Sequence, residues 1–291
     1  MALYRAKDEG GNAVLLFDAP MQAAVDARAA LEMALRDAVE TQAFQLYYQV
    51  QVDLHGTVVG AEALIRWIGA DGKVISPAEF IPLAEDTGLI VPMGQWVLDT
   101  ACRQLARWQR SPATRHLTLA INVSARQFHQ ADFVSQVRAA LERHHLDANG
   151  LKLELTESVI LGDIDTTIEH MHQLHELGIR FALDDFGTGY SSLSYLKRLP
   201  FDQLKIDQSF IHDMLIDHTS NAIVRAVLVM SDALGLKVVA EGVETAAHRD
   251  FLVEHGCQIC QGYLLGRPMP IEAWEEAHLA VGPAPGDTPT P

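Results

Sequence analysis

Short apolar segments recur along the chain, and a helical pattern separates most of them. The first two strand-like segments, residues 44–50 and 58–67, are joined by Asp53, His55 and Gly56, which favour turns. This connection is too short for a parallel crossover, so we expect the two strands to form an antiparallel hairpin. Six further strands are predicted after helical patterns, at residues 117–123, 151–156, 181–184, 203–206, 238–240 and 259–264.

Repeated strand and helix units are typical of parallel strands. Eight strands within roughly 230 residues predict an α/β fold, a TIM-like (β/α)8 barrel whose first strand is antiparallel. Residues 41–276 are expected to form this domain. The Ala-rich segment 21–40 is predicted to be a linker helix, because Leu31, Leu35 and Val39 follow a helical spacing.

The two ends of the chain differ from the barrel pattern. Residues 2–9 resemble the end of a helix and residues 12–17 a short strand, which together cannot bury a core. We therefore interpret residues 1–20 as the remnant of an upstream domain. Residues 277–291 are Pro-rich and are predicted to be a flexible tail.

The composition is that of an ordinary folded protein, but the charge is not. Of 291 residues, 48% are hydrophobic and 21% are charged. The 22 basic and 38 acidic side chains leave a net charge of 22 − 38 = −16. This balance argues against a duplex nucleic-acid partner, which would require a broad basic surface.

Three cysteines, an odd and small number, indicate a reducing compartment rather than a disulfide framework. Cys257 and Cys260 form a CxxC, which we interpret as two buried small hydrophobic residues because no second pair completes a zinc site. No apolar run reaches membrane-spanning length, since Arg225 interrupts the best one. We expect a cytoplasmic segment without direct membrane contact, in a full-length protein that can still be membrane-tethered.

Polar residues lie at the ends of seven predicted strands, and none is expected from the first strand. The carboxyl ends of parallel barrel strands meet at one mouth, so these residues should converge from distant parts of the sequence. They are Glu62, Arg66, Asn122, Glu154, Glu157, Asp184, Asp185, Lys205, Asp207, Glu241, Glu244 and Gln261.

A crowd of carboxylates predicts a metal site. Like charges at close range raise one another's pKa unless a cation neutralises them. Asn122 adds an amide oxygen, and neither His nor Cys occupies these positions, so the ligands suit Mg²⁺ or Mn²⁺ better than Zn²⁺. Two ions are the economical interpretation, because one ion needs fewer than the five carboxylates of Glu62, Glu154, Asp184, Asp185 and Glu241.

Two metal ions beside a lysine and an arginine suit displacement at phosphorus. Glu62, Leu64 and Arg66 share one face of their strand, and at about 3.3 Å per residue Arg66 reaches far enough to bind a second phosphate. Asp185 would point away from Asp184 in a regular strand, and we expect the Gly-containing loop after it to redirect its side chain. Lys205 is expected to pair with acids and to position or deprotonate a nucleophilic water.

Several strings occur in a fixed order: EALIRW, SPAEFIPLAEDTGLI, INVS, ELTES, DDFGTGYSS, KIDQSF, AEGVET and QGY. Over about residues 31–274 the chain resembles the EAL domain family of cyclic di-GMP phosphodiesterases. The resemblance implies a homodimeric EAL barrel that hydrolyses cyclic di-GMP to linear pGpG with two Mg²⁺ or Mn²⁺ ions. The opening MALYRAKDEGGNAVLLF resembles the last helix and strand of a GGDEF diguanylate cyclase domain, so residues 1–20 are interpreted as its tail.

The resemblance also implies roles for individual residues. Arg66 corresponds to the phosphate contact and Lys205 to the residue that holds the catalytic water. Glu241, regarded in the family also as a general base, is interpreted here as a ligand. The implied metal ligands are Glu62, Asn122, Glu154, Asp184, Asp185 and Glu241, and Asp184 bridges the two ions. Glu157 is implied to anchor the DDFGTGYSS loop. The residues implied to surround the substrate are Leu64, Asp207, Glu244 and Gln261.

One position departs from the family pattern, since Val50 stands where a proline usually follows YYQ. It carries no assigned role. The ligand set is complete, which favours an enzyme over a catalytically silent cyclic di-GMP receptor, the main alternative. A two-metal phosphodiesterase for another nucleotide is the third hypothesis.

Overall fold

The computed structural model describes residues 19–69, 72–160, 164–187, 196 and 198–279. Within this part of the chain, eight strands close into a barrel: β1 Phe44–Asp53, β2 Val58–Ile68, β4 Thr118–Val123, β5 Leu151–Thr156, β6 Arg180–Phe186, β7 Gln203–Ile206, β8 Lys237–Ala240 and β9 Ile259–Cys260.

Strand pairing confirms the predicted topology. The barrel order is β1-β9-β8-β7-β6-β5-β4-β2, and β1 also pairs with β2 to close it. Neighbours from β2 round to β9 are parallel, whereas β1 is antiparallel to β9. The fold is therefore a TIM-like α/β barrel with its first strand reversed.

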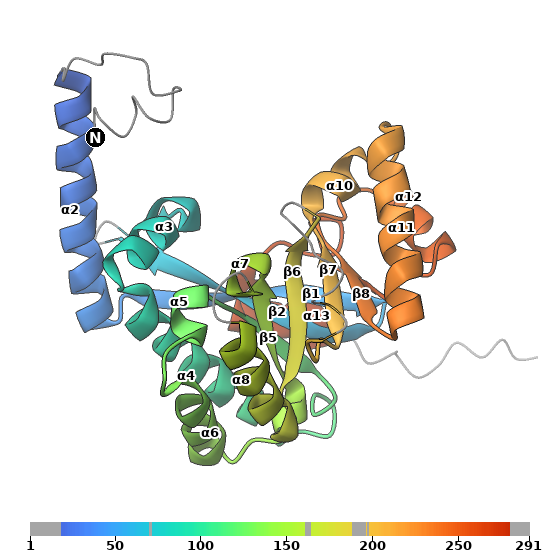
Figure 1. Ribbon diagram of the computed structural model, residues 1–291, viewed down its shortest axis with the longest axis horizontal. Coiled ribbons are helices and arrows are strands. Elements are labelled where there is room, and N and C mark those ends of the chain that lie inside the picture. The colour runs from blue at the N-terminus through green and yellow to red at the C-terminus, as the bar shows by residue number, and fades with distance from the viewer. Residues whose placement is uncertain (1–18, 70–71, 161–163, 188–195, 197, 280–291) are drawn as a thin grey trace, which may run out of the picture. The chain divides into compact units, whose positions relative to one another are not determined.

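Helices follow the parallel strands and lie outside the barrel wall (Figure 1). The longer ones are α4 Ile90–Gln109, α6 Phe133–His144, α8 Ile164–Glu176, α11 His218–Leu234, α12 Ala246–Glu254 and α13 Ile271–Leu279. Short helices α5 Ala125–Phe128, η1 Ala148–Gly150, α7 Glu157–Ile160 and α10 Gln208–Asp213 and the short strand β10 Met269–Pro270 complete this part of the structure. Among the described residues, no helix is both long enough and apolar enough to cross a membrane.

The contacts divide the chain into two compact units, residues 1–44 with 67–89, and residues 45–66 with 90–291. The first unit contains α2 Ala19–Thr41, β3 Val74–Ile75 and α3 Pro77–Thr87. In it the ring of Phe80 is fully buried and lies edge-on to Trp67, with the ring centroids 5.7 Å apart. The helix predicted at 21–40 is thus present as α2. The helix predicted at 2–9 and the strand at 12–17 lie outside the described residues.

Several predicted boundaries differ from the structure: β1 continues to Asp53 instead of residue 50, and β6 continues to Phe186 instead of residue 184. β9 ends at Cys260 instead of continuing to residue 264, because the chain turns at Gly262, whose carbonyl accepts hydrogen bonds from the amides of Leu265 and Gly266. A Cβ at Gly262 would lie 2.2 Å from the Val243 nitrogen, so the turn packs directly on backbone. The predicted tail boundary at 276 falls inside α13, and residues 280–291 lie outside the described part.

The two faces of each barrel strand have different chemistry. In β5, Leu153 and Leu155 are buried in one apolar cluster with helix residues such as Met171. Lys152 and Glu154 alternate with them and are also buried. Helices thus cover the apolar outer face of the wall, while the inner face carries polar and charged groups. Cys257 and Cys260 are free and buried, as predicted.

Lys152 is only 5% exposed and forms no hydrogen bond or ion pair with another described residue, so we expect its burial to reduce the stability of the protein. Burial lowers its pKa to about 8. Because the pKa falls from 10.5 and each pKa unit corresponds to about 1.4 kcal/mol, we expect Lys152→Met to raise the unfolding free energy by about 3 kcal/mol at pH 7. Denaturant titration measures this difference.

The stability difference between Lys152→Met and the wild type should decrease as the pH rises. Between pH 8 and the ordinary lysine value, the unfolded wild type binds more protons than the folded form, so wild-type stability rises with pH. The advantage of Lys152→Met should therefore be full below pH 8 and shrink by pH 10. Lys237→Met, which changes an exposed lysine on β8, is the comparison; because the charge of Lys237 contributes to the lowered pKa of Lys152, its replacement should also stabilise, but by much less than Lys152→Met. A destabilised Lys152→Met protein at pH 7 would contradict the prediction.

Candidate active site

A buried ammonium group lies at the centre of the barrel mouth. Lys205, on β7, is 1% exposed, and its Nζ lies near carboxylates from four other segments of the wall. The distances are 2.5 Å to Glu154 Oε2, 2.7 Å to Glu241 Oε1, 3.1 Å to Asp184 Oδ1 and 3.5 Å to Glu62 Oε2. Side chains separated by up to 179 positions in the sequence (241 − 62) thus meet around one positive charge.

Strand register explains how the side chains come together. Asn122 of β4 is paired with Glu154 of β5, so both project to the same side of the wall. The Nδ2 group of Asn122 donates to Glu62 Oε1 at 2.6 Å, and Nε2 of Gln261 donates to Glu62 Oε2 at 2.6 Å. Each oxygen of the Glu62 carboxylate is therefore held by one amide, and Asn122 Oδ1 stays available as a ligand.

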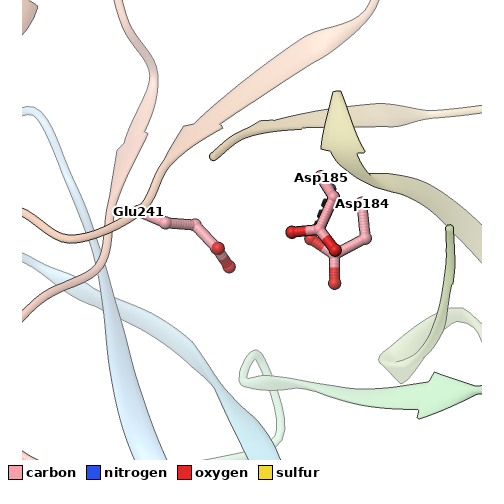
Figure 2. Close-up of side chains that lie close together, drawn as sticks. All are labelled: Asp184, Asp185 and Glu241. Atoms are coloured by element: carbon pink, nitrogen blue, oxygen red, sulfur yellow. Dashed lines mark hydrogen bonds between the residues drawn. The ribbon is translucent and has the colours of Figure 1, made fainter. Parts of the chain in front are cut away.

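The backbone conformation of Asp185 directs its side chain into the cluster. Its φ of 53° is left-handed, a region that aspartate tolerates better than most residues, and the β6–β7 pairing is irregular between Leu183 and Phe186. The redirection expected from the following loop therefore occurs at Asp185 itself, two residues before Gly187. Figure 2 shows the carboxylates of Asp184, Asp185 and Glu241 facing a common space, with one oxygen of each within 4.8 Å of the others.

The positive and negative charges of this cluster do not cancel. Five carboxylates and one ammonium give 1 − 5 = −4 if all are ionised. Burial raises the pKa of Glu154 well above its usual range, and the charge of Glu62 adds to the rise. Burial also raises the pKa of Glu241 to about 8, against the opposing effect of Lys205. A cation bound here would relieve this repulsion.

The donor chemistry selects the kind of cation. Asp184, Asp185 and Glu241 offer only carboxylate oxygens, and Glu62, Glu154 and Asn122 lie beside them with further oxygens. Hard oxygen ligands suit Mg²⁺ and Mn²⁺. The residues present therefore fit a divalent metal, and the acidic cluster is a candidate metal centre.

A pocket opens next to the cluster and contains the candidate substrate residues. Arg66, Leu64, Glu244 and Gln261 line it together with Glu62, Asp184, Lys205 and Glu241. The Arg66 guanidinium carbon lies 5.5 Å from the centroid of the Tyr47 ring, which holds the arginine by a cation–π contact. The pocket thus combines an acidic centre with a positive group at its margin.

Asp207 and Glu157 accept hydrogen bonds from backbone amides. Asp207 caps α10, since its Oδ1 accepts a hydrogen bond from the Ser209 amide at 3.0 Å, and its neighbour Gln208 lines the pocket. Glu157, at the start of α7, accepts from the Gly187 amide at 3.4 Å. The contact of Glu157 is at the beginning of the DDFGTGYSS loop, most of which lies outside the described residues.

The expectation that the first strand contributes no polar group is wrong. Gln49 and Gln51 of β1 are buried, and both are hydrogen-bonded to Gln261. The alternation of glutamine with apolar residues in YYQVQV is a signal that could have revealed them. The sequence also did not reveal Tyr47, which lies on the same strand β1, or Gln208 and Tyr263, which reach the pocket from the start of α10 and the turn after β9.

Residues 32–268 match the family model of the EAL domain. The chain belongs to the EAL domain family. In Pseudomonas aeruginosa it is similar to the bifunctional diguanylate cyclase/cyclic di-GMP phosphodiesterase MucR, with 46% identity over 272 residues, 93% of this chain and 40% of MucR. It is also similar to the cyclic di-GMP phosphodiesterase NbdA of that organism, with 41% identity over 277 residues, 95% of this chain and 35% of NbdA.

Solved structures show the same likeness. A complex of the PaMucR phosphodiesterase with c-di-GMP is 47% identical, has a TM-score of 0.81, and is matched over 84% of this chain and 99% of that one. The EAL enzyme Bd1971 with cAMP and cyclic di-GMP bound is 32% identical with a TM-score of 0.83, over 94% of this chain and 72% of that one. The chain spans less than half the length of the curated relatives it matches.

A metal-binding prediction follows from the acidic cluster. Mn²⁺ at 100 times its dissociation constant should stabilise the wild type by about 2.7 kcal/mol, because the ion binds the folded state. Asp185→Asn removes one carboxylate while asparagine still tolerates the positive φ, so it should require more Mn²⁺ for the same rise in Tm. In EDTA, the variant should melt at or above the wild-type temperature, since repulsion is reduced.

Thermal melting with and without Mn²⁺ measures both effects. Asp232→Asn, which removes an exposed carboxylate from α11, is the matched control and should respond to Mn²⁺ like the wild type. An unchanged Mn²⁺ response of Asp185→Asn would exclude this carboxylate from the metal site.

Proposed function

We propose that the chain is a metal-dependent phosphodiesterase that hydrolyses cyclic di-GMP to linear 5′-pGpG. The observation that carries the proposal is the cluster of carboxylates around Lys205, which shares one pocket with Arg66 in a barrel of the EAL family. The named activities of MucR and NbdA and the c-di-GMP in the PaMucR complex support the choice of substrate.

Two Mg²⁺ or Mn²⁺ ions are proposed as the cofactors. Their ligands would be Glu62, Asn122, Glu154, Asp184, Asp185 and Glu241, with Asp184 between the two ions. When bound, such ions polarise a phosphodiester and make a nearby water more acidic. The high pKa of metal-free Glu241 fits a carboxylate that needs a cation beside it, and we assign it as a ligand in preference to a general base.

Lys205 and Arg66 act on different parts of the substrate in this proposal. The surrounding carboxylates raise the pKa of Lys205 well above its ordinary value despite the opposing effect of burial, so the amine keeps its proton. It therefore positions the attacking water as a hydrogen-bond donor and does not deprotonate it. Arg66 lies four residues beyond Glu62 on β2, about 13 Å along an extended strand, and would bind the second phosphate.

The proposal also covers the domain boundaries, the upstream segments and the oligomeric state. Residues 41–276 would be the phosphodiesterase domain of a cytoplasmic homodimer, α2 its linker, and residues 1–20 the tail of a GGDEF-like domain. The length of MucR, of which the chain spans 40%, and the cyclase named in it support an upstream neighbour of this kind. Leu64, Gln261, Asp207 and Glu244 would surround the substrate, and Glu157 would anchor the DDFGTGYSS loop.

Product analysis tests the activity directly. The protein is incubated with cyclic di-GMP and Mg²⁺ or Mn²⁺, and linear pGpG is measured by chromatography, with EDTA as the metal-free control. We expect metal-dependent formation of pGpG. Binding of cyclic di-GMP without any linear product would identify a receptor instead, and turnover of a different cyclic nucleotide in a substrate panel would correct the substrate.

Two variants separate metal binding from water positioning. Glu62→Ala should abolish turnover because metal affinity is lost, and Lys205→Ala should lower kcat by about 100-fold while Mn²⁺ affinity is retained. Mn²⁺ titration and kcat, measured on the same preparations, distinguish the two outcomes. Since Lys205→Ala leaves buried carboxylates without their ammonium, its fold is checked in the presence of Mn²⁺. Equal loss of metal in both variants would contradict the role of Lys205.

A further inference from the structure

Three buried glutamines form a hydrogen-bonded relay at the barrel mouth and end on Glu62. The Nε2 group of Gln261 donates to Glu62 Oε2 at 2.6 Å and to Gln49 Oε1 at 3.1 Å. Gln51 Nε2 donates to Gln261 Oε1 at 2.9 Å, and Gln49 Nε2 donates to the Gly266 carbonyl at 3.2 Å. All three side chains are at most 8% exposed.

The direction of every bond in this relay is fixed by its ends. An ionised carboxylate and a backbone carbonyl only accept hydrogen bonds. Both oxygens of Glu62 face donors, since Oε1 accepts from Asn122, and Lys205 Nζ lies 3.5 Å from Oε2, so Glu62 acts as an acceptor and the nitrogen of Gln261 faces it. The oxygen of Gln261 must then face Gln51, which therefore presents its own nitrogen.

This arrangement leaves one polar atom unsatisfied. Gln51 is 1% exposed, and its Oε1 is buried without a hydrogen-bond partner among the described residues. Turning the Gln51 amide would give this oxygen no better partner, because it would then face the oxygen of Gln261. A buried acceptor without a partner is unfavourable for folding, so an apolar side chain of similar length, which removes this acceptor together with the hydrogen bond to Gln261 Oε1, should cause no net loss of stability.

We propose that Gln51 is a positioning residue that locks Gln261 in the orientation that donates to Glu62. It acts through Gln261 and touches neither substrate nor metal. The inference rests on the proposed function in so far as Glu62 is a metal ligand of a phosphodiesterase. Its distinctive consequence is that activity falls without a loss of stability when Gln51 is replaced.

The first test is Gln51→Met. Methionine fills the site without a polar atom, so Tm should stay equal to the wild-type value or rise. Gln261 Oε1 then loses the hydrogen bond from Gln51, so the Gln261 amide is held less firmly against Glu62, and both Mn²⁺ affinity and kcat should fall about 10-fold, as is typical for groups that orient a metal ligand. A Gln51→Met protein with wild-type affinity and kcat, or one whose losses accompany a lower Tm, would overturn the proposal.

Gln104→Met is the matched control. Gln104 is also a buried glutamine, and its Nε2 donates to Glu275 Oε1 at 2.9 Å, outside the candidate site. Its replacement should lower Tm and leave kcat and Mn²⁺ affinity unchanged. Gln51→Met should thus lower kcat and Mn²⁺ affinity without lowering Tm, whereas Gln104→Met should lower Tm without changing kcat or Mn²⁺ affinity.

Gln51→Glu tests the direction of the relay. When the new carboxyl is ionised it can only accept, so it repels Gln261 Oε1 and competes with Glu62 for the nitrogen of Gln261. In its protonated form it can donate to Gln261 as Gln51 does, and kcat is therefore measured at the alkaline end of the accessible pH range. We expect a loss of about 100-fold in kcat, larger than in Gln51→Met. A smaller loss than in Gln51→Met would overturn the proposed direction.

The measurements separate this inference from the proposed function. If the wild type forms no pGpG but Mn²⁺ affinity follows the expected order of the variants, the relay stands and the activity fails. If the wild type forms pGpG and the Gln51 variants match it in kcat and Mn²⁺ affinity, the activity stands and the relay fails.

Discussion

The ammonium of Lys205, buried among four carboxylates, is the interaction on which the barrel mouth depends. A lysine this deeply buried is stable as a cation only when acids surround it, and buried acids require compensation in return. One ammonium does not balance five carboxylates. The excess is reduced by amide donors on Glu62, by the raised pKa of Glu154 and Glu241, and in our proposal by divalent ions. Structural stability and metal binding are therefore linked at this site.

The barrel architecture makes such a polar interior possible. Because helices bury the outer, apolar face of each strand, the apolar core lies between wall and helices, and the inner face can carry ionisable groups. Parallel strands then bring one or two such groups each to the same end. The same constraint explains Lys152, which is buried on the inner face of β5, where the nearby charge of Glu154 only partly offsets the effect of burial on its pKa.

Most of the fold and much of the candidate site could be predicted from the sequence. Strand and helix alternation gave the barrel and its reversed first strand, and the rule that strand ends converge collected Glu62, Glu154, Asp184, Lys205 and Glu241. What could not be predicted was local geometry. The left-handed backbone of Asp185 and the turn at Gly262 depend on tertiary packing that periodicity does not encode. The coordination and substrate roles of these residues remain proposals.

The missed glutamines show where the strand-end rule fails. β1 is antiparallel and Val52 pairs with Cys260 at the end of β9, so the β1 residues before Val52 lie at the mouth where the other strands have their carboxyl ends. Gln51 is therefore next to Gln261, and Gln49 lies further out. The reversed strand thus places the inward side chains of Gln49 and Gln51 near Glu62. A search restricted to the carboxyl ends of strands overlooks them. A rule for this fold should examine the first strand from its other end.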